Sequence, residues 1–137
     1  QIKITPFLVP HRDEYSETIG FNISGQNKSV LFIPDIDKWE LWQKDIIAEI
    51  KRNDALFLDA TFFDGTELPG RDMSQIPHPF VIESMQLFID LSIREKQKIH
   101  FIHFNHTNPL YQSESNARKV LNKAGFQVAK QGQIINL

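Results

Sequence analysis

Residues 29–59, SVLFIPDIDKWELWQKDIIAEIKRNDALFLD, decide the fold class of this chain. Ser29–Ile33 is an apolar run that predicts a strand, and Ala55–Leu58 predicts a second, buried strand. Between them, residues 39–52 place apolar side chains on one face of a helix, for which Asp37 is the expected N-cap. A strand, a helix and a strand in this order indicate an α/β protein whose sheet carries helices on at least one face.

The segments on either side extend this pattern. The other expected elements are strands over 1–9 and 19–23, the second forming a hairpin with 29–33, then a helix over 80–95, a strand over 98–104, a helix over 113–124, and a final hairpin of 126–129 with 133–137. Residues 63–79 form a long loop with two glycines and three prolines. Because loops beyond about 12 residues are uncommon inside compact domains, a loop of this length is often functional.

The composition is that of one ordinary globular domain of 137 residues, with 41% hydrophobic and 23% charged residues. A net charge of −2 excludes the strongly basic footprint of a general nucleic-acid-binding protein. The absence of cysteine excludes disulfides, thiolate zinc sites and a cysteine nucleophile. No apolar run approaches the ~20 residues of a membrane helix. We expect a cytoplasmic location, with the periplasm as the alternative, since a chain without cysteine suits both.

Titratable side chains follow four of the expected strands at the point where each one ends. His11, Asp35 and Asp59 each follow or end one strand. His103 and His106 lie at the end of a fourth, the strand that begins at Lys98. Side chains at strand ends of α/β sheets converge on one crevice. Histidine and carboxylate are the ligands that zinc, manganese and iron share, so this pattern indicates a metal centre or an acid–base site.

Each of these residues also has a structural interpretation, which spacing alone leaves open. His11 lies in a charged run typical of a solvated loop, and Asp35 or Asp37 can cap the following helix. His78 stands between two prolines and can serve a rigid turn. His100 faces away from the later histidines of its strand, so we expect it to be structural.

Four motifs, taken in order, resemble the metallo-β-lactamase superfamily. They are Val9–Phe21, Leu31–Trp39, Leu58–Phe62 with Arg71–Met73, and Phe101–Pro109. The likeness is greatest to the branch that contains the pyrroloquinoline-quinone biosynthesis protein B, and extends further off to the ribonuclease Z group. The likeness covers residues 5–112. No single motif is specific to the superfamily, but the four motifs in this order are.

The resemblance implies an αββα sandwich built from two halves. This chain resembles the C-terminal half, one mixed sheet with helices packed on one face, as a single domain over residues 1–137. The HxHxDH motif of the N-terminal half is absent, and the chain opens with Gln1, so we expect a piece of a longer or processed protein. The expected partners are the missing half or, through the exposed sheet face, a second copy in a homodimer.

The resemblance also implies roles for individual residues. His11 matches a metal-ligand histidine, Asp35 the aspartate that bridges two metals, and His103 the last ligand histidine. Asp59 matches the acidic residue of the ribonuclease Z box, and His78 the histidine that pairs with it, a pair suited to acid–base catalysis.

Three more residues, His106, Asn105 and Arg71, are expected to face the substrate. The cofactors implied are two divalent ions, zinc first, with manganese or iron as alternatives.

The implied function is hydrolysis of an ester, phosphodiester or amide-type bond by a metal-bound hydroxide. Two alternatives stay open: oxygen-dependent oxidation at a histidine/carboxylate iron site, as in quinone-cofactor biosynthesis, and a non-catalytic binding domain. With the HxHxDH segment absent, we expect the 137 residues alone to bind metal weakly and to be inactive.

Overall fold

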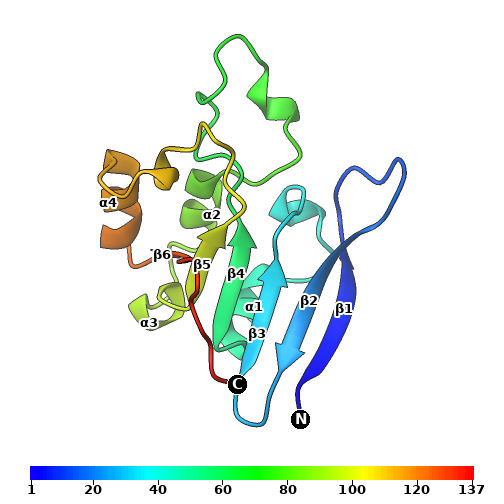
Figure 1. Cartoon of the computed structure of the whole chain (residues 1–137). Helices are drawn as coiled ribbons and strands as arrows, with labels where there is room; N and C mark the ends of the chain where they lie inside the picture. Colours follow the sequence, from blue (N-terminus) through cyan, green and yellow to red (C-terminus); the bar gives the residue numbers. More distant parts are fainter.

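A computed structural model describes the whole chain, residues 1–137, as a six-stranded sheet whose strands follow one another in chain order (Figure 1). The strands are β1 (Lys3–Val9), β2 (Thr18–Ser24), β3 (Ser29–Ile33), β4 (Ala55–Asp59), β5 (Ile99–Ile102) and β6 (Gln127–Val128). The first three pair antiparallel, and β4, β5 and β6 each add parallel to the strand before. The expected mixed sheet is confirmed.

The direction of each strand follows from the connection that precedes it. A short turn joins β2 to β3, so these two strands run antiparallel. Each later connection contains helix and carries the chain back to the end of the sheet where the previous strand began, so the next strand runs parallel. Strands β3, β4 and β5 therefore all end at one edge of the sheet, drawn at the top of Figure 1. This edge carries the polar residues described below.

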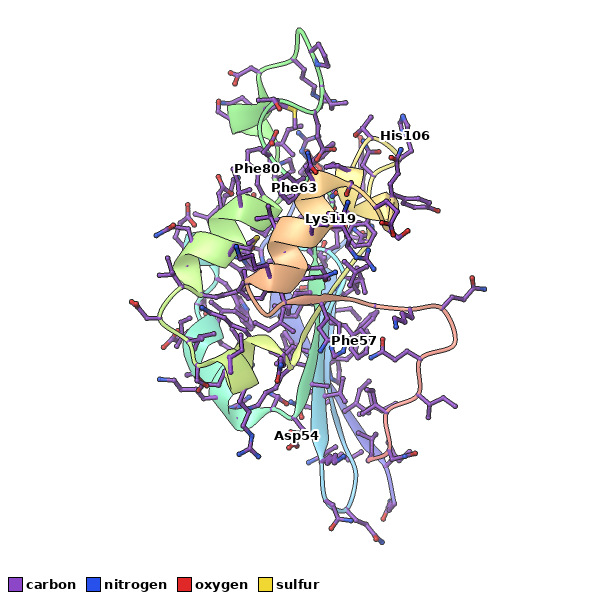
Figure 2. The ribbon with its side chains drawn as sticks, turned by 90° about the vertical axis from the view of Figure 1, so that its left-hand side faces the viewer. Asp54, Phe57, Phe63, Phe80, His106 and Lys119 are labelled. Carbon is purple, nitrogen blue, oxygen red and sulfur yellow. The ribbon has the colours of Figure 1, made fainter.

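The helices all lie on one face of the sheet, and the last residues of the chain cross the other face (Figure 2). The α-helices are α1 (Ile46–Arg52), α2 (Val81–Leu87), α3 (Ile93–Lys96) and α4 (Asn116–Lys123). Single turns of 3-10 helix, labelled η1 (Trp39–Leu41), η2 (Met73–Gln75) and η3 (Pro109–Tyr111), lie in the connections. None of the helices is both long and apolar enough to cross a bilayer.

The two faces of the sheet are covered differently because side chains alternate along each strand. Leu56 and Leu58 of β4 point into the core under the helices and are fully buried. Phe57, between them, faces the opposite side, where it lines a shallow groove with Ile135 and Leu137 of the C-terminal segment. The core therefore lies between the sheet and its helices.

The expected helix over 39–52 is wrong in its first half. Helix α1 begins at Ile46, and its N-cap is Asp45, whose carboxylate accepts a hydrogen bond from the Ile47 amide at 2.8 Å. The two tryptophans before it are anchored to different parts of the fold. Trp39 Nε1 donates to Ser84 Oγ at 2.9 Å, and Trp42 Nε1 donates to the carbonyl of Leu8 at 3.3 Å.

Two other expected elements also differ from the structure. The helix expected over 80–95 is two helices, because Ser92 forms a capping box with Glu95 and starts α3 anew. The expected final hairpin is absent: β6 pairs parallel with β5, and residues 133–137 form no strand. Ile135 and Leu137 of that last segment line the groove on the sheet face instead, whereas Ile134 is exposed.

Candidate metal centre

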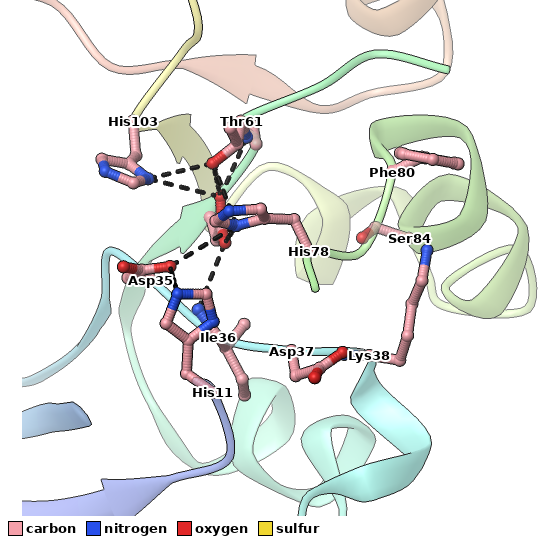
Figure 3. Close-up of polar contacts among 12 residues, drawn as sticks. His11, Asp35, Ile36, Asp37, Lys38, Thr61, His78, Phe80, Ser84 and His103 are labelled. Carbon is pink, nitrogen blue, oxygen red and sulfur yellow. Dashed lines mark hydrogen bonds and ion pairs between the residues drawn. The ribbon is translucent and has the colours of Figure 1, made fainter. Parts of the chain in front are cut away.

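Five titratable side chains from five segments meet at the upper edge of the sheet, and Figure 3 labels His11, Asp35, His78 and His103 among them. His11 follows β1, Asp35 follows β3, Asp59 is the last residue of β4, His103 follows β5, and His78 comes from the long loop. The expected crevice at the strand ends is thus present in the structure. The chemical roles expected for these residues remain predictions, and their geometry is as follows.

Asp35 lies between two imidazoles. Its Oδ1 is 3.3 Å from His11 Nε2 and 3.4 Å from His78 Nδ1. One possible ligand atom each from Asp35, Asp59, His78 and His103 lies within 4.8 Å of the others, close enough to surround a metal ion. His11 is outside that group of four but contacts it through Asp35.

Asp59 is the buried centre of the site. It is fully buried, and its Oδ2 lies 2.7 Å from His78 Nδ1 and accepts a hydrogen bond from the Ile36 amide at 3.2 Å. Its Oδ1 accepts from the Thr61 amide at 2.9 Å and from the Thr61 hydroxyl at 2.7 Å. The carboxylate is therefore held in place from several sides, and it in turn orients the His78 ring.

These contacts set the protonation behaviour of two residues. Burial alone would raise the pKa of Asp59, but the His103 ring, 3.6 Å from its Oδ1, and hydrogen bonds with His78 and Thr61 hold that pKa below its ordinary value. The same interaction with Asp59 raises the pKa of His103, although partial burial opposes it. Asp59 therefore stays ionised and provides the negative charge that a cation or an imidazolium needs.

The long loop reaches the site because it has a small core of its own. Phe62, Met73, Ile76 and Phe80 are buried against one another, with Leu68 packed at their side. This cluster holds the segment before α2, so His78 is presented to Asp59 from a packed loop. The glycine and proline content of 63–79 predicted the loop, and this cluster explains how it is fixed.

Thr61 is a site residue that the sequence analysis did not assign. Its hydroxyl lies 3.2 Å from His78 Nδ1 and 3.0 Å from His103 Nδ1, in addition to its bond with Asp59. The available signal was the Leu58–Phe62 motif, in which Thr61 stands two residues after Asp59. A hydroxyl at that spacing can return to the carboxylate in a turn.

Asn108 is a second residue that was missed. It is buried, and its side-chain amide donates to the carbonyls of Ala60 at 2.7 Å and Thr61 at 3.3 Å. It thereby ties the segment after β5 to the segment after β4. His103, which lies between the end of β5 and Asn108, has a φ of 65°, a left-handed conformation that non-glycine residues rarely adopt. Strain of this kind is concentrated at functional sites.

The donor set fits a divalent cation. Asp35 Oδ1 is buried and accepts no hydrogen bond, although two imidazole nitrogens lie within 3.4 Å of it. His11 Nδ1 is also buried without a partner. Buried polar atoms are rarely left unpaired, so a carboxylate oxygen that accepts no hydrogen bond beside two imidazole nitrogens suits a bound ion.

The three residues expected to face the substrate occupy different surroundings. His106 is exposed and points away from the sheet (Figure 2), and no contact joins it to the site. The Asn105 amide donates to Thr107 Oγ1 at 2.7 Å, and that hydroxyl donates to Glu67 at 2.8 Å, linking two loops. Only Arg71 lines the pocket that also contains His11 and His78, a cavity of about 240 Å³.

Comparison with known proteins gives a consistent result. A family model described as "Beta-lactamase superfamily domain" matches residues 1–103. The chain is 27% identical over 126 residues to Coenzyme PQQ synthesis protein B of Gluconobacter oxydans (strain 621H), covering 88% of this chain and 40% of that protein. It is 28% identical over 142 residues to the protein of the same name from Nitrosococcus oceani, covering 96% of this chain and 45% of that protein.

Two solved structures share the fold. One is Zn(2+)-bound PqqB from Methylobacterium extorquens, with a TM-score of 0.76, 23% identity, and coverage of 99% of this chain and 50% of that one. The other is the metallo-beta-lactamase fold protein YhfI from Bacillus subtilis, with a TM-score of 0.58, 16% identity, and coverage of 93% and 46%. The chain thus spans about half the length of these structures, and 40–45% of the curated relatives above.

Proposed function

The chain belongs to the beta-lactamase superfamily, and on that premise we propose that it forms part of the active site of a metal-dependent hydrolase. The bond cleaved would be an ester, a phosphodiester or an amide-type bond. The observation that carries the proposal is the Asp59–His78 pair, 2.7 Å apart, directly beside the Asp35 and His103 donors. An imidazole held by a buried carboxylate next to a cation site is suited to hydrolysis.

In this proposal His11, Asp35 and His103 hold the metal. Two ions are proposed, with Asp35 between them and zinc as the first choice, because imidazole and carboxylate are its usual nitrogen and oxygen ligands. Bound divalent ions would supply a nucleophilic water at neutral pH and polarise the bond to be cleaved. The similarity in fold to a zinc-bound structure supports the choice of metal.

His78 is proposed as the acid–base residue. Its Nδ1 lies 2.7 Å from Asp59 Oδ2, so the carboxylate can keep the proton on Nδ1 and leave Nε2 free to exchange a proton with the leaving group. The Thr61 hydroxyl, 3.2 Å from the same nitrogen, limits rotation of the ring. The His78 ring is thereby held in an orientation suited to proton transfer through Nε2.

We further propose that tight metal binding needs donors beyond these 137 residues. Three ligand side chains leave positions open even on a single tetrahedral ion, and two ions need more. The chain covers less than half of the curated relatives described above, so such donors have room to exist in the whole protein. The 137 residues alone should then bind zinc weakly and show no turnover.

A second candidate is oxygen-dependent oxidation at an iron site. The observation in its favour is that the curated relatives described above are named Coenzyme PQQ synthesis protein B. Histidine and carboxylate donors suit non-haem iron as well as zinc, so the residues at the strand ends allow either chemistry.

The test is to purify the whole protein, measure its metal content, and assay a chromogenic phosphodiester and a lactone in parallel with oxygen consumption. Zinc or manganese with substrate turnover supports the hydrolase. Iron with oxygen uptake supports the oxidase instead. A protein that binds metal stoichiometrically but does neither would match the third alternative, a binding domain that retains the fold.

A further inference from the structure

Two arginines open onto the same side of the metal centre. Arg12 and Arg71 line the cavity of about 240 Å³ that also has His11 and His78 in its wall. Arg12 directly follows His11 in the chain, and Arg71 comes from the long loop that also presents His78. Two exposed arginines from separate segments thus line one pocket with two residues of the site.

Neither guanidinium group has a partner within the chain. No ion pair or hydrogen bond engages either one, whereas Arg52 pairs with Glu49 at 2.8 Å and Arg118 donates to the Leu110 carbonyl at 2.8 Å. The acidic residues next to them in sequence are turned elsewhere. Asp72 accepts hydrogen bonds from Ser74.

Asp13, the neighbour of Arg12, lines a different pocket with Trp42. The positive charge of the two arginines is therefore not neutralised by the carboxylates next to them in the sequence. The remainder of the wall includes Phe62 and Ile76, whose apolar side chains are largely buried and leave little room for water behind them. Charge interactions are stronger where water is partly excluded.

We propose that Arg12 and Arg71 bind an oxyanion of the substrate, a carboxylate or a phosphate, beside the bond that the metal centre acts on. This proposal rests on the function proposed above. Neither arginine is paired with an acidic residue, so an anionic group of the substrate is the partner that complements them.

The residue type is informative as well as the charge. A guanidinium group presents parallel N–H donors that match both oxygens of a carboxylate or phosphate, whereas a lysine ammonium acts as a point charge. Two such groups at one pocket can hold an anion in a fixed orientation. The arginines would then select the substrate and position it, without touching the reacting atoms.

The test uses the chain with all metal removed by chelation, so that anions cannot bind to an ion and no turnover is needed. Methyl phosphate and succinate are titrated separately, and binding is followed by NMR shifts of the Thr61 and His78 backbone amides. Arg12→Gln and Arg71→Gln are compared with the wild type. Arg94→Gln is the matched control, since it removes the same charge from an exposed arginine on α3.

Each of the two pocket variants is expected to weaken binding of the preferred anion about tenfold, the lower limit for losing a charge-assisted hydrogen bond. Arg94→Gln should bind like the wild type. Preference for methyl phosphate identifies a phosphate-bearing substrate, and preference for succinate a carboxylate. Saturable binding that both pocket variants leave unchanged, equal weakening in Arg94→Gln, or no binding of either probe would overturn the proposal. None of these outcomes depends on whether the metal centre hydrolyses anything.

Discussion

The two ends of the parallel strands carry the same kinds of polar residue, but these residues differ in how far the fold provides them with hydrogen bonds. At the lower end, Asp54 precedes β4 and accepts a hydrogen bond from the Ser29 amide at 2.9 Å. At the upper end, Asp35 follows β3, and its buried Oδ1 accepts none. The two aspartates thus differ in whether the fold itself satisfies them.

The polar groups of the lower end are engaged in holding the chain together. Asn53 is buried, accepts a hydrogen bond from Asn22 at 3.0 Å and donates one to the Glu49 carbonyl at 2.9 Å. The buried Glu49 Oε2 accepts no hydrogen bond of good geometry but forms an ion pair with Arg52 Nη2 at 2.8 Å. Lys98 Nζ lies 3.3 Å from the carbonyl of Ile50 at the end of α1. Such groups contribute stability and leave no capacity for a ligand.

The upper end is arranged for binding at some cost to stability. Unpaired acceptors, the left-handed backbone of His103 and two arginines without partners lie around one crevice. Natural proteins keep such features where function requires them, because stability there is traded for activity. The difference between the ends therefore predicts that substitutions at the upper end reduce metal or substrate binding, whereas substitutions at the lower end reduce the stability of the fold.

The largest expected effect is the loss of metal on Asp35→Asn. The amide removes the charge and one acceptor from the proposed bridging position, so zinc affinity of the whole protein should fall more than the 10–100-fold typical of an outer partner. The matched control is Asp54→Asn at the lower end, which should leave zinc affinity unchanged. Calorimetric titration measures both, and equal affinities for the two variants would break the comparison.

The next effect in size concerns turnover. His78→Ala in the whole protein should lower the rate by about 10²–10⁴-fold, the usual contribution of an acid–base residue, while the zinc content stays the same. Steady-state kinetics with metal analysis of the same sample separates the two. Parallel loss of zinc and activity would instead make His78 a ligand or a structural residue.

At the lower end the expected effect is on folding. Asn53→Ala removes a buried amide that joins β2 to α1, so the free energy of unfolding should fall by about 1–3 kcal/mol. Chemical denaturation measures this change. Asn122→Ala, on the exposed surface of α4, should change stability by less than about 0.5 kcal/mol. An Asn53→Ala protein of unchanged stability would show that the lower end is not held as described.

The smallest effect is a pH dependence at His100, which stacks on Phe57 on the sheet face opposite the helices. Burial lowers the pKa of His100 below 6.5, with hydrogen bonds to the backbone of Lys98 and Leu56 partly opposing it. The unfolded chain then binds more protons than the folded one below pH 6.5, so this residue's contribution is complete above that pH and declines as the pH falls.

His100→Phe should remove that decline while keeping the aromatic contact with Phe57. The measurement is the difference between the wild-type and variant free energies of unfolding from pH 7.5 down to 5, which cancels the opposing contribution of His103. A difference that does not change with pH would contradict a buried neutral His100.

Sequence reasoning was accurate where a local pattern and the tertiary fold agree. Apolar runs fixed the strands, and the position of His11, Asp35, Asp59 and His103 at strand ends was enough to predict that they meet. It failed where one cap competes with another. Asp45 rather than Asp37 starts α1, and Ser92 interrupts a continuous apolar stripe, because each makes a local hydrogen bond that periodicity does not reveal.

The C-terminal segment, Thr61 and Asn108 were not predicted for a different reason, which is that their contacts depend on the folded sheet. Whether Gln127–Val128 pairs with a preceding strand or with residues 133–137 depends on which sheet edge is vacant, which only the fold determines. Asn108 acts through the carbonyls of Ala60 and Thr61, which are distant in sequence, and nothing in its immediate neighbours marks it. Thr61 has a local signal in its spacing from Asp59, but its approach to His78 and His103 depends on the fold.

The most direct test of the metal centre is anomalous diffraction at the zinc edge from crystals of this chain soaked in excess zinc, which compensates for weak affinity. The account predicts a peak at the upper edge of the sheet, about 2.0–2.2 Å from Asp35 and from at least one of His11 and His103. A peak confined to the exposed His106, or no peak at the strand ends under saturating zinc, would contradict it.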